Sequence, residues 1–271
     1  MPLPKAVLIS LSLVPVVVPA VYLAVVQVLV SRQIATSGTT KRVLTKKDKL
    51  LAQTSTATAE NAAPPKSIPE HLLDDAAPYV VTCERVVSRP IPASALTDPI
   101  LFDAAASDKQ KTSYVLTSYL RGTMSAFAWT PQGLIMKSVV SDAAVRRTFS
   151  LNYIRGLTFV ASDLACGAYQ VTYRAGAEGN AALSRDRVEL SIVPLADRPD
   201  LVVHGVIVTE IERTPTEVVF VNETWMWRHA TDEKPTMIEG AVGRWLHSLV
   251  GGWMILKGTK KVTAPTRVKA E

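Results

Sequence analysis

The sequence is poor in residues that bind metals or form covalent cross-links. Only two of its 271 residues are cysteines, Cys83 and Cys166, which is too few for a disulfide framework. The four histidines lie at no spacing that suits a metal site. No phosphate-binding glycine loop, nucleophile elbow or Cys/His pair is present. We therefore expect two buried free thiols, no metal site and no cofactor.

Charge is missing from Ala6 to Val30, a run longer than the ~20 apolar residues that cross a bilayer. No small-residue cleavage site follows it, which favours an uncleaved single-pass anchor over a signal peptide. Basic residues are frequent after the run, and positive flanks stay on the cytosolic side. The sequence therefore predicts an anchor in the endoplasmic reticulum membrane, with the following domain facing the cytosol.

The formal net charge of +6 is concentrated outside the predicted domain. Residues 32–66 carry seven basic and two acidic residues, and residues 257–271 carry five basic and one acidic. The region between them is net acidic, and no nucleic-acid recognition module is visible. The basic flanks are suited to anionic lipid headgroups, so we expect membrane lipid and no nucleic acid among the partners.

Composition divides the chain into four parts. Residues 1–31 form the anchor and residues 32–70 a basic linker rich in Thr, Ala, Ser and Lys, which we expect to be disordered. Residues 71–258 form an α+β cavity domain, and residues 259–271 a basic tail. The chain has no internal repeat, and its pattern does not predict the oligomeric state.

Hydrophobic periodicity predicts one strand, two helices, a run of strands and a closing helix. The expected helices cover residues 107–129 and 132–140. The expected strands cover residues 79–87, 149–154, 157–160, 168–174, 187–193, 201–212 and 217–228. This order predicts an α+β fold in which a curved antiparallel sheet packs on a long C-terminal helix.

The last strand and the closing helix show the clearest patterns. The strand alternates two largely apolar faces, so we expect it to be covered on both sides. Thr236 to Glu239 reads as a capping box, and Gly258 is placed to end the helix. An apolar stripe on this helix comprises Ile238, Ala241, Val242, Trp245, Leu249, Trp253 and Leu256. A curved sheet around such a helix predicts an apolar cavity between them.

This order of elements resembles the helix-grip superfamily of polyketide cyclases and lipid-transfer proteins. Residues 218–222 leading into Gly243-Arg244-Trp245-Leu246 carry the most specific similarity, which covers about the final third of the chain. A ketosteroid-isomerase-like cone is a competing resemblance. Both families enclose a cavity, so the resemblance implies a hydrophobic ligand, but it implies no catalytic residue.

Candidate site residues come from the last strand and its neighbours. Glu223 shares a face with Trp225 and Trp227, whose rings would desolvate its carboxylate and favour a catalytic base. The alternative is a carboxylate paired with an arginine of a neighbouring strand. Trp225 and Trp227 would line the cavity, the alternative being two core residues. Arg228 at the strand end would bind an acidic substrate, or lie in solvent.

Three further residues complete the predicted site. His204 lies beside Gly205 and is a second candidate catalytic group, the alternative being a structural histidine. Tyr169 would line the cavity. His247 would form its polar end if the face of the closing helix opposite the tryptophans meets the cavity.

Together these patterns favour a membrane-anchored cavity protein that performs a cofactor-free cyclisation, isomerisation or dehydration on a hydrophobic small molecule. Such a step suits polyketide or terpenoid biosynthesis. A lipid or sterol carrier without chemistry is the first alternative, because no strong catalytic motif is present. A membrane tether for another enzyme is the second alternative. The sequence does not identify the substrate.

Overall fold

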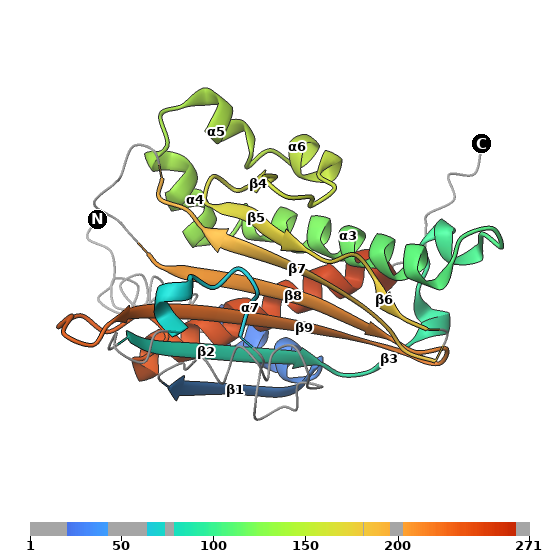
Figure 1. Ribbon diagram of the computed structural model, residues 1–271, viewed down its shortest axis with the longest axis horizontal. Coiled ribbons are helices and arrows are strands. Elements are labelled where there is room, and N and C mark those ends of the chain that lie inside the picture. Colours follow the sequence, from blue (N-terminus) through green and yellow to red (C-terminus); the bar gives the residue numbers. More distant parts are fainter. Residues whose placement is uncertain (1–20, 43–63, 74–78, 181, 196–202, 264–271) are drawn as a thin grey trace, which may run out of the picture.

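The computed structural model describes residues 21–42, 64–73, 79–180, 182–195 and 203–263. Within these residues a nine-stranded antiparallel sheet is the largest element. Its main path runs β1-β2-β9-β8-β7-β5-β4, with β3 paired to β9 and β6 paired to β7 (Figure 1). The prediction of an α+β fold with a curved antiparallel sheet and a C-terminal helix is confirmed.

The strands are β1 (Ile34–Arg42), β2 (Tyr79–Ser88), β3 (Ile91–Pro92), β4 (Leu164–Ala165), β5 (Tyr169–Arg174), β6 (Glu178–Gly179), β7 (Ser184–Ile192), β8 (Gly205–Arg213) and β9 (Glu217–His229). The helices are α3 (Asp108–Phe127), α4 (Pro131–Val139), α5 (Ala143–Arg147), α6 (Leu151–Gly156) and α7 (Ala241–Thr263). Short 3-10 turns are η1 (Glu70–Leu73), η2 (Ala93–Ala95) and η3 (Pro99–Phe102). Residues 21–31 form a further helix, here named the amino-terminal helix.

The two long helices lie side by side on one face of the sheet. Figure 1 views the sheet from the opposite side, so that α3 and α7 pass behind the strands and run in opposite directions. α3 contacts β7 and β8, whereas α7 contacts β2 and β9. We name the face that they cover the helix face and the other the far face.

Side chains fill the space between the sheet and the two long helices. Leu116, Leu120 and Ile255 are fully buried there. Tyr119 of α3 stacks on Phe220 of β9 with ring centroids 4.3 Å apart, and burial raises the pKa of its hydroxyl. A cavity was expected in this layer, but a packed core occupies it.

The closing helix differs from its prediction at both ends. Glu239 accepts a hydrogen bond from the backbone of Thr236, as in a capping box, yet α7 begins only at Ala241. Gly258 does not end the helix, which continues to Thr263. Gly258 instead lies where α7 meets α3, since a Cβ there would be 2.4 Å from the Tyr119 ring. The glycine therefore lets the two helices approach closely.

The predicted helix over residues 132–140 corresponds to α4, but the two strands predicted between α4 and β5 are absent from the structure. Residues 149–154 were expected to form a strand, but Ser150 accepts a hydrogen bond from the Tyr153 amide and starts α6. Asp142 starts α5 in the same way through the amides of Ala144 and Val145. Residues 157–160 form no strand either. Local capping outweighed the apolar pattern here.

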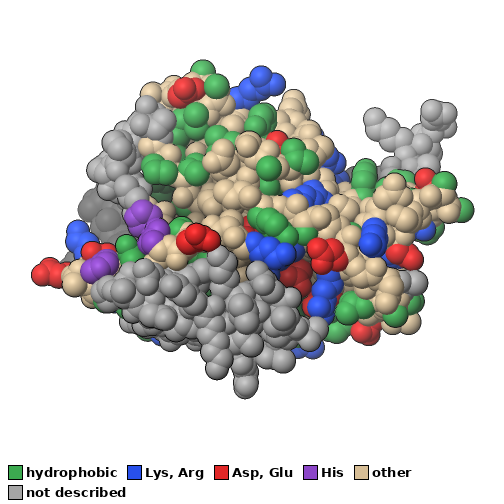
Figure 2. All heavy atoms as spheres, in the orientation of Figure 1, with side chains coloured by type: hydrophobic (Ala, Val, Ile, Leu, Met, Phe, Trp, Pro, Cys, Tyr) green, Lys and Arg blue, Asp and Glu red, His purple; other side chains and the backbone are tan. Residues whose placement is uncertain are grey.

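The far face is divided into an apolar half and a charged half. In its apolar half, residues of the strands pack against Ile68 and against Leu72 of η1. These strand residues are Val81, Cys83, Val206, Val208, Trp225 and Trp227. In its charged half, cross-strand register places Arg85 opposite Glu223, Arg187 opposite Glu210 and Arg185 opposite Glu212. Figure 2 shows acidic and basic side chains side by side over the middle of this face. Both cysteines are buried and free, as expected.

The start of the described chain adds an edge strand to the sheet. Residues 34–42, which composition assigned to the linker, form β1 and pair with β2. The amino-terminal helix packs on α7, where Val26 and Val30 contact Leu249. None of the described helices combines the length and hydropathy of a membrane span. Residues 1–20, which hold most of the predicted anchor, lie outside the described residues.

Candidate functional site

A large groove lies on the outer side of the helical layer. It has a volume of about 1650 Å³, and no strand contributes to its lining. α3 and α7 contribute about half of its lining, and the amino-terminal helix and residues 129–136 contribute much of the rest. This groove therefore lies between helices, not between the sheet and the closing helix, where the cavity was predicted.

Small residues on α3 leave the room for this groove. Ser118, Gly122, Ser125 and Ala126 line it together with Tyr114 and Arg121, while Leu116, Tyr119 and Leu120 of α3 are buried in the core. On α7 the groove is lined by Leu246, Val250 and Trp253. The sequence contains this signal, because four small residues recur at helical spacing on α3. The apolar stripe of α3, however, predicts only the opposite face of the helix, which packs on the sheet.

Basic side chains are more numerous than acidic ones along the groove. Its charged lining residues are Arg121, Arg155, Lys257, Lys260, Lys261 and Asp98. Asp98 is already engaged, since it accepts hydrogen bonds from the Ile100 amide and from the Ser118 hydroxyl. The Lys257 ammonium lies 4.2 Å from the centroid of the Trp253 ring. The groove thus combines apolar walls with an excess of positive charge.

One predicted site residue, His247, lies in the groove. Its ring lines the groove wall, and its Nδ1 forms a hydrogen bond with the carboxylate of Glu84 from β2. The neighbouring Ser248 hydroxyl donates to the other oxygen of Glu84. The side chain of Glu84 is only 2% exposed. No sequence motif marked Glu84 or Ser248, because β2 and α7 are far apart in the chain.

The predicted catalytic base, Glu223, forms an ion pair away from the groove. Glu223 is buried on the far face, where it pairs with Arg85 of β2 and accepts a hydrogen bond of 2.9 Å from the Trp225 indole. This is the alternative that the sequence left open, a carboxylate paired with an arginine of a neighbouring strand. Trp225 and Trp227 belong to the apolar cluster beneath η1 and line no part of the groove.

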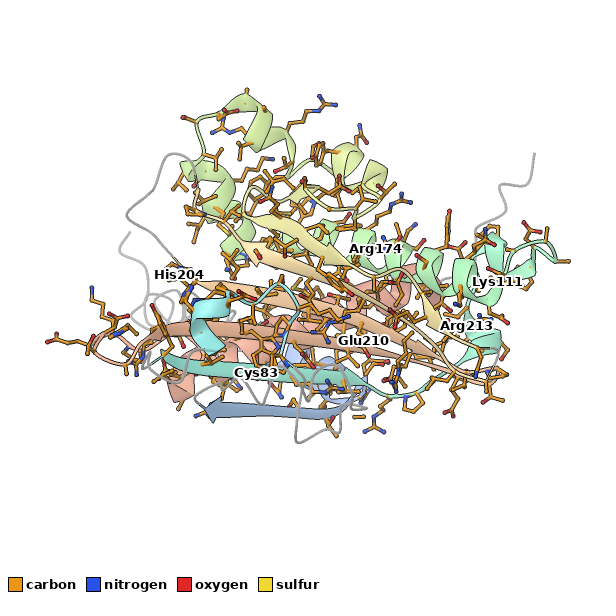
Figure 3. All side chains as sticks on the ribbon, viewed as in Figure 1. Cys83, Lys111, Arg174, His204, Glu210 and Arg213 are labelled. Atoms are coloured by element: carbon orange, nitrogen blue, oxygen red, sulfur yellow. The ribbon has the colours of Figure 1, made fainter. Side chains whose placement is uncertain are left out.

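The remaining predicted residues are also separate from the groove. His204 is exposed and directly precedes β8, and its ring stacks on Trp227 with the centroids 6.3 Å apart. Figure 3 shows it near the start of β8, away from Glu210. Arg228 pairs with Glu239. Tyr169 is buried in the core against Phe127. Of the seven predicted site residues, the structure places His247 alone at the groove.

Comparisons of the chain with protein-family models, curated proteins and solved structures give no match. The resemblance to helix-grip proteins therefore stays a prediction. Among the described residues, no three His, Cys, Asp or Glu side chains lie close enough to hold a metal ion. The function of the groove has to be argued from its own shape, polarity and charge.

Proposed function

We propose that the protein binds a hydrophobic small molecule carrying an anionic group, and that it does so at the surface of a membrane. The observation that carries this proposal is the groove of about 1650 Å³, which is larger than most small-molecule pockets. Its apolar walls suit a long hydrocarbon or polycyclic body. An open groove of this size is more compatible with an elongated ligand than with a compact polar metabolite.

The charge of the groove favours an anionic group on that ligand. Lys257, Lys260 and Lys261 line the groove from the last turns of α7, and Arg121 lines it from α3, where its Nε donates to the Leu157 carbonyl. A carboxylate or phosphate near these side chains would form charge-assisted hydrogen bonds, while the hydrophobic body lies along Val250 and Trp253. A neutral ligand would use only the apolar part of the groove.

Exposed apolar side chains beside the groove support the membrane placement. They lie on the amino-terminal helix and on the first turns of α7, and comprise Val21, Tyr22, Val25, Val28, Leu29, Val242, Trp245 and Leu246. The amino-terminal helix also continues the uncharged run that begins at Ala6. Apolar residues next to basic ones are typical of a surface that lies in the headgroup region of a bilayer.

Filling the groove should abolish binding. Ser125 lines it from α3, so Ser125→Trp places an indole in the ligand space. We expect a dansyl-labelled fatty acid to bind the wild-type protein, and the substitution to weaken binding by roughly a hundredfold, equivalent to about 2.7 kcal/mol. Titration of dansyl fluorescence measures this change.

The matched control is Lys109→Trp, on the exposed first turn of the same helix and outside the groove. It should leave the affinity unchanged. A dansyl fatty acid that binds both variants equally well, or fails to bind the wild type, would contradict the proposed ligand site.

Contact of this face with the membrane should place the Trp245 side chain near the lipid acyl chains. Trp245 is 46% exposed beside the groove, whereas Trp225 is 1% exposed beneath η1. With the full chain on vesicles of phosphatidylcholine and phosphatidylserine, brominated acyl chains should quench part of the tryptophan fluorescence. Trp245→Phe should remove about half or more of that quenching, because indole quenching falls steeply with distance from the lipid surface.

Trp225→Phe is the control, since its indole faces the packed far side of the sheet. Quenching that is unaffected by Trp245→Phe would mean that this face does not meet the bilayer. A cyclase- or isomerase-type step on the bound molecule, as in natural-product biosynthesis, stays a second proposal. The specific observation that favours it is an imidazole in the groove wall.

A further inference from the structure

Glu84 is a buried carboxylate with an unusual set of partners. It lies on the helix face of β2 with 1% of its surface exposed. Its two oxygens accept hydrogen bonds from His247 and Ser248, both on α7. Among the side chains that the structure describes, no Lys or Arg forms an ion pair with it, and its direct partners are His247 and Ser248. A buried carboxylate is stable only when its oxygens are hydrogen-bonded or paired in this way.

The ring of His247 spans the boundary between the core and the groove. Its Nδ1 faces the sheet and donates to Glu84, and the ring lines the groove. The two nitrogens of an imidazole point in nearly opposite directions, so Nε2 is directed away from Glu84. Within the described residues Nε2 has no hydrogen-bond partner. In the part of the chain that the structure describes, Nε2 is thus the imidazole nitrogen without a partner, on the side of the ring away from Glu84.

His247 is also the group in the groove that suits proton transfer near neutral pH. The other charged lining residues are Asp98, Arg121, Arg155, Lys257, Lys260 and Lys261, and their ordinary pKa values lie far from neutrality. Histidine alone among these types titrates between pH 5 and 8 when unperturbed. Glu84 is the charged group in direct contact with it.

We propose that His247 is a catalytic acid–base residue acting on the ligand in the groove, and that Glu84 is its positioning residue. This inference rests on the proposed ligand site. By accepting a hydrogen bond from Nδ1–H, Glu84 holds the tautomer in which Nε2 can accept a proton, and it stabilises the imidazolium that then forms. Ser248 fixes the second oxygen of Glu84 and so the orientation of the pair.

The substrate class is a hydrophobic molecule with a carbonyl group, and the reaction is proton transfer without a metal or redox partner. In ester hydrolysis, Nε2 takes a proton from water as the water oxygen bonds to the carbonyl carbon. The C–O bond then breaks, and the leaving oxygen departs with its electron pair and receives the proton. Ester and water give acid and alcohol, so atoms and electrons balance.

A long-chain activated ester tests this assignment in the full-length protein. We expect p-nitrophenyl decanoate to be cleaved faster than p-nitrophenyl acetate, because its chain occupies the groove. His247→Gln should lower decanoate cleavage by roughly a hundredfold, the lower end of what a positioned acid–base group contributes. The matched control is His71→Gln, an exposed histidine on η1 outside the groove, which should have no effect.

The pH profile separates positioning from a merely structural role. Glu84→Gln should lower the decanoate rate and change its dependence on pH, because the carboxylate of Glu84 contacts the imidazole at Nδ1. A lower rate with an unmoved profile would mean that Glu84 only supports the fold.

Two outcomes distinguish this inference from the proposed ligand site. If His247→Gln keeps the decanoate rate while the dansyl fatty acid still binds, the acid–base role is wrong and the ligand site stands. If the fatty acid does not bind the wild type, the ligand site itself is wrong. Should His247→Gln fail to fold, the double variant Glu84→Gln/His247→Gln removes the buried charge as well.

Chemical modification of the unaltered protein gives a second measurement. Diethyl pyrocarbonate should carbethoxylate Nε2 of His247, and the dansyl fatty acid should protect this residue but not His71. Peptide mass spectrometry identifies the modified residues. A His247 that stays unmodified, or one that the fatty acid does not protect, would overturn the placement of Nε2 in the groove.

Discussion

Gly258→Val is expected to destabilise the protein by about 3 kcal/mol or more, because it separates the two long helices. A Cβ at this position would lie 2.4 Å from the Tyr119 ring and 2.5 Å from the Thr123 hydroxyl, both on α3. Neither side chain can retreat, since both are buried against the sheet. Urea unfolding followed by circular dichroism measures the loss.

A matched glycine on the same helix should behave in the opposite way. At Gly251 the nearest atom to an added Cβ is a Val86 methyl at 3.7 Å, an ordinary contact. Gly251→Ala should therefore gain up to about 1 kcal/mol from helix propensity. If Gly258→Val were as stable as Gly251→Ala, α3 and α7 would not be in close contact, and the groove between them would lose its walls.

Glu223→Gln is expected to cost about 3–5 kcal/mol through the loss of a buried ion pair. The carboxylate of Glu223 is 2% exposed and pairs with Arg85, whose side chain is 15% exposed. Glutamine can still accept a hydrogen bond from the Trp225 indole, so the loss of stability reports the cost of the unpaired Arg85 guanidinium. Thermal unfolding should show a large drop in midpoint, with ligand binding at the groove retained below it.

The neighbouring cross-strand pair is the control. Arg185 and Glu212 lie in the same charged half of the far face with an N–O distance of 3.0 Å, but their side chains are 34% and 30% exposed. Glu212→Gln should therefore cost under about 1 kcal/mol. Adding Arg85→Met to Glu223→Gln should restore most of the stability. A small loss in Glu223→Gln, or no recovery in the double variant, would show that the pair is not effectively buried.

The strands and long helices were predictable because their patterns are local. β9 alternates between the two faces of the sheet, so Phe220 reaches the helix-face core and Trp225 the far-face cluster, as period two requires. Ser107 caps α3 through a capping box with Gln110, a signal within four residues. The error at α6 is also local, since the Ser150 cap was present in the sequence but was outweighed by its apolar neighbours.

The position of the groove was not predictable, because apolar periodicity identifies an apolar face of a helix but not the element that packs against that face. Trp245 and Val242 continue the stripe of Leu249 and Leu256 in the sequence, yet they are 46% and 72% exposed. Leu249 and Leu256 are buried together with Gly252, Ile255 and Thr259. The residues that cover this part of α7 are distant in the sequence, since Gly252 lies against Val30 of the amino-terminal helix and Gly258 against Tyr119 of α3.

The acid–base pair of the groove depends on contacts across the whole chain. Glu84 and His247 are 163 residues apart, and no spacing rule connects them. The sequence predicted His247 at a cavity only if the helix face opposite the tryptophans lined it, whereas Trp253 and His247 line the same groove, and the sequence could not supply the partner of His247. Similarly, the pairing of Glu223 with Arg85 follows from the register of β2 and β9. Register is a tertiary property, so the sequence could only leave both alternatives open.

The connection between the amino-terminal helix and β1 bears on how a leading segment in a membrane would hold the folded domain. Only Arg32 and Gln33 separate the two elements, and backbone hydrogen bonds from Gln33 to Val30 and from Arg89 to Gln33 clamp this corner. A leading segment inserted in a bilayer would thus be joined to the sheet by a rigid corner and not by a flexible linker. The domain would keep one height and one tilt above the lipid, and its ligand would enter and leave along a constant route.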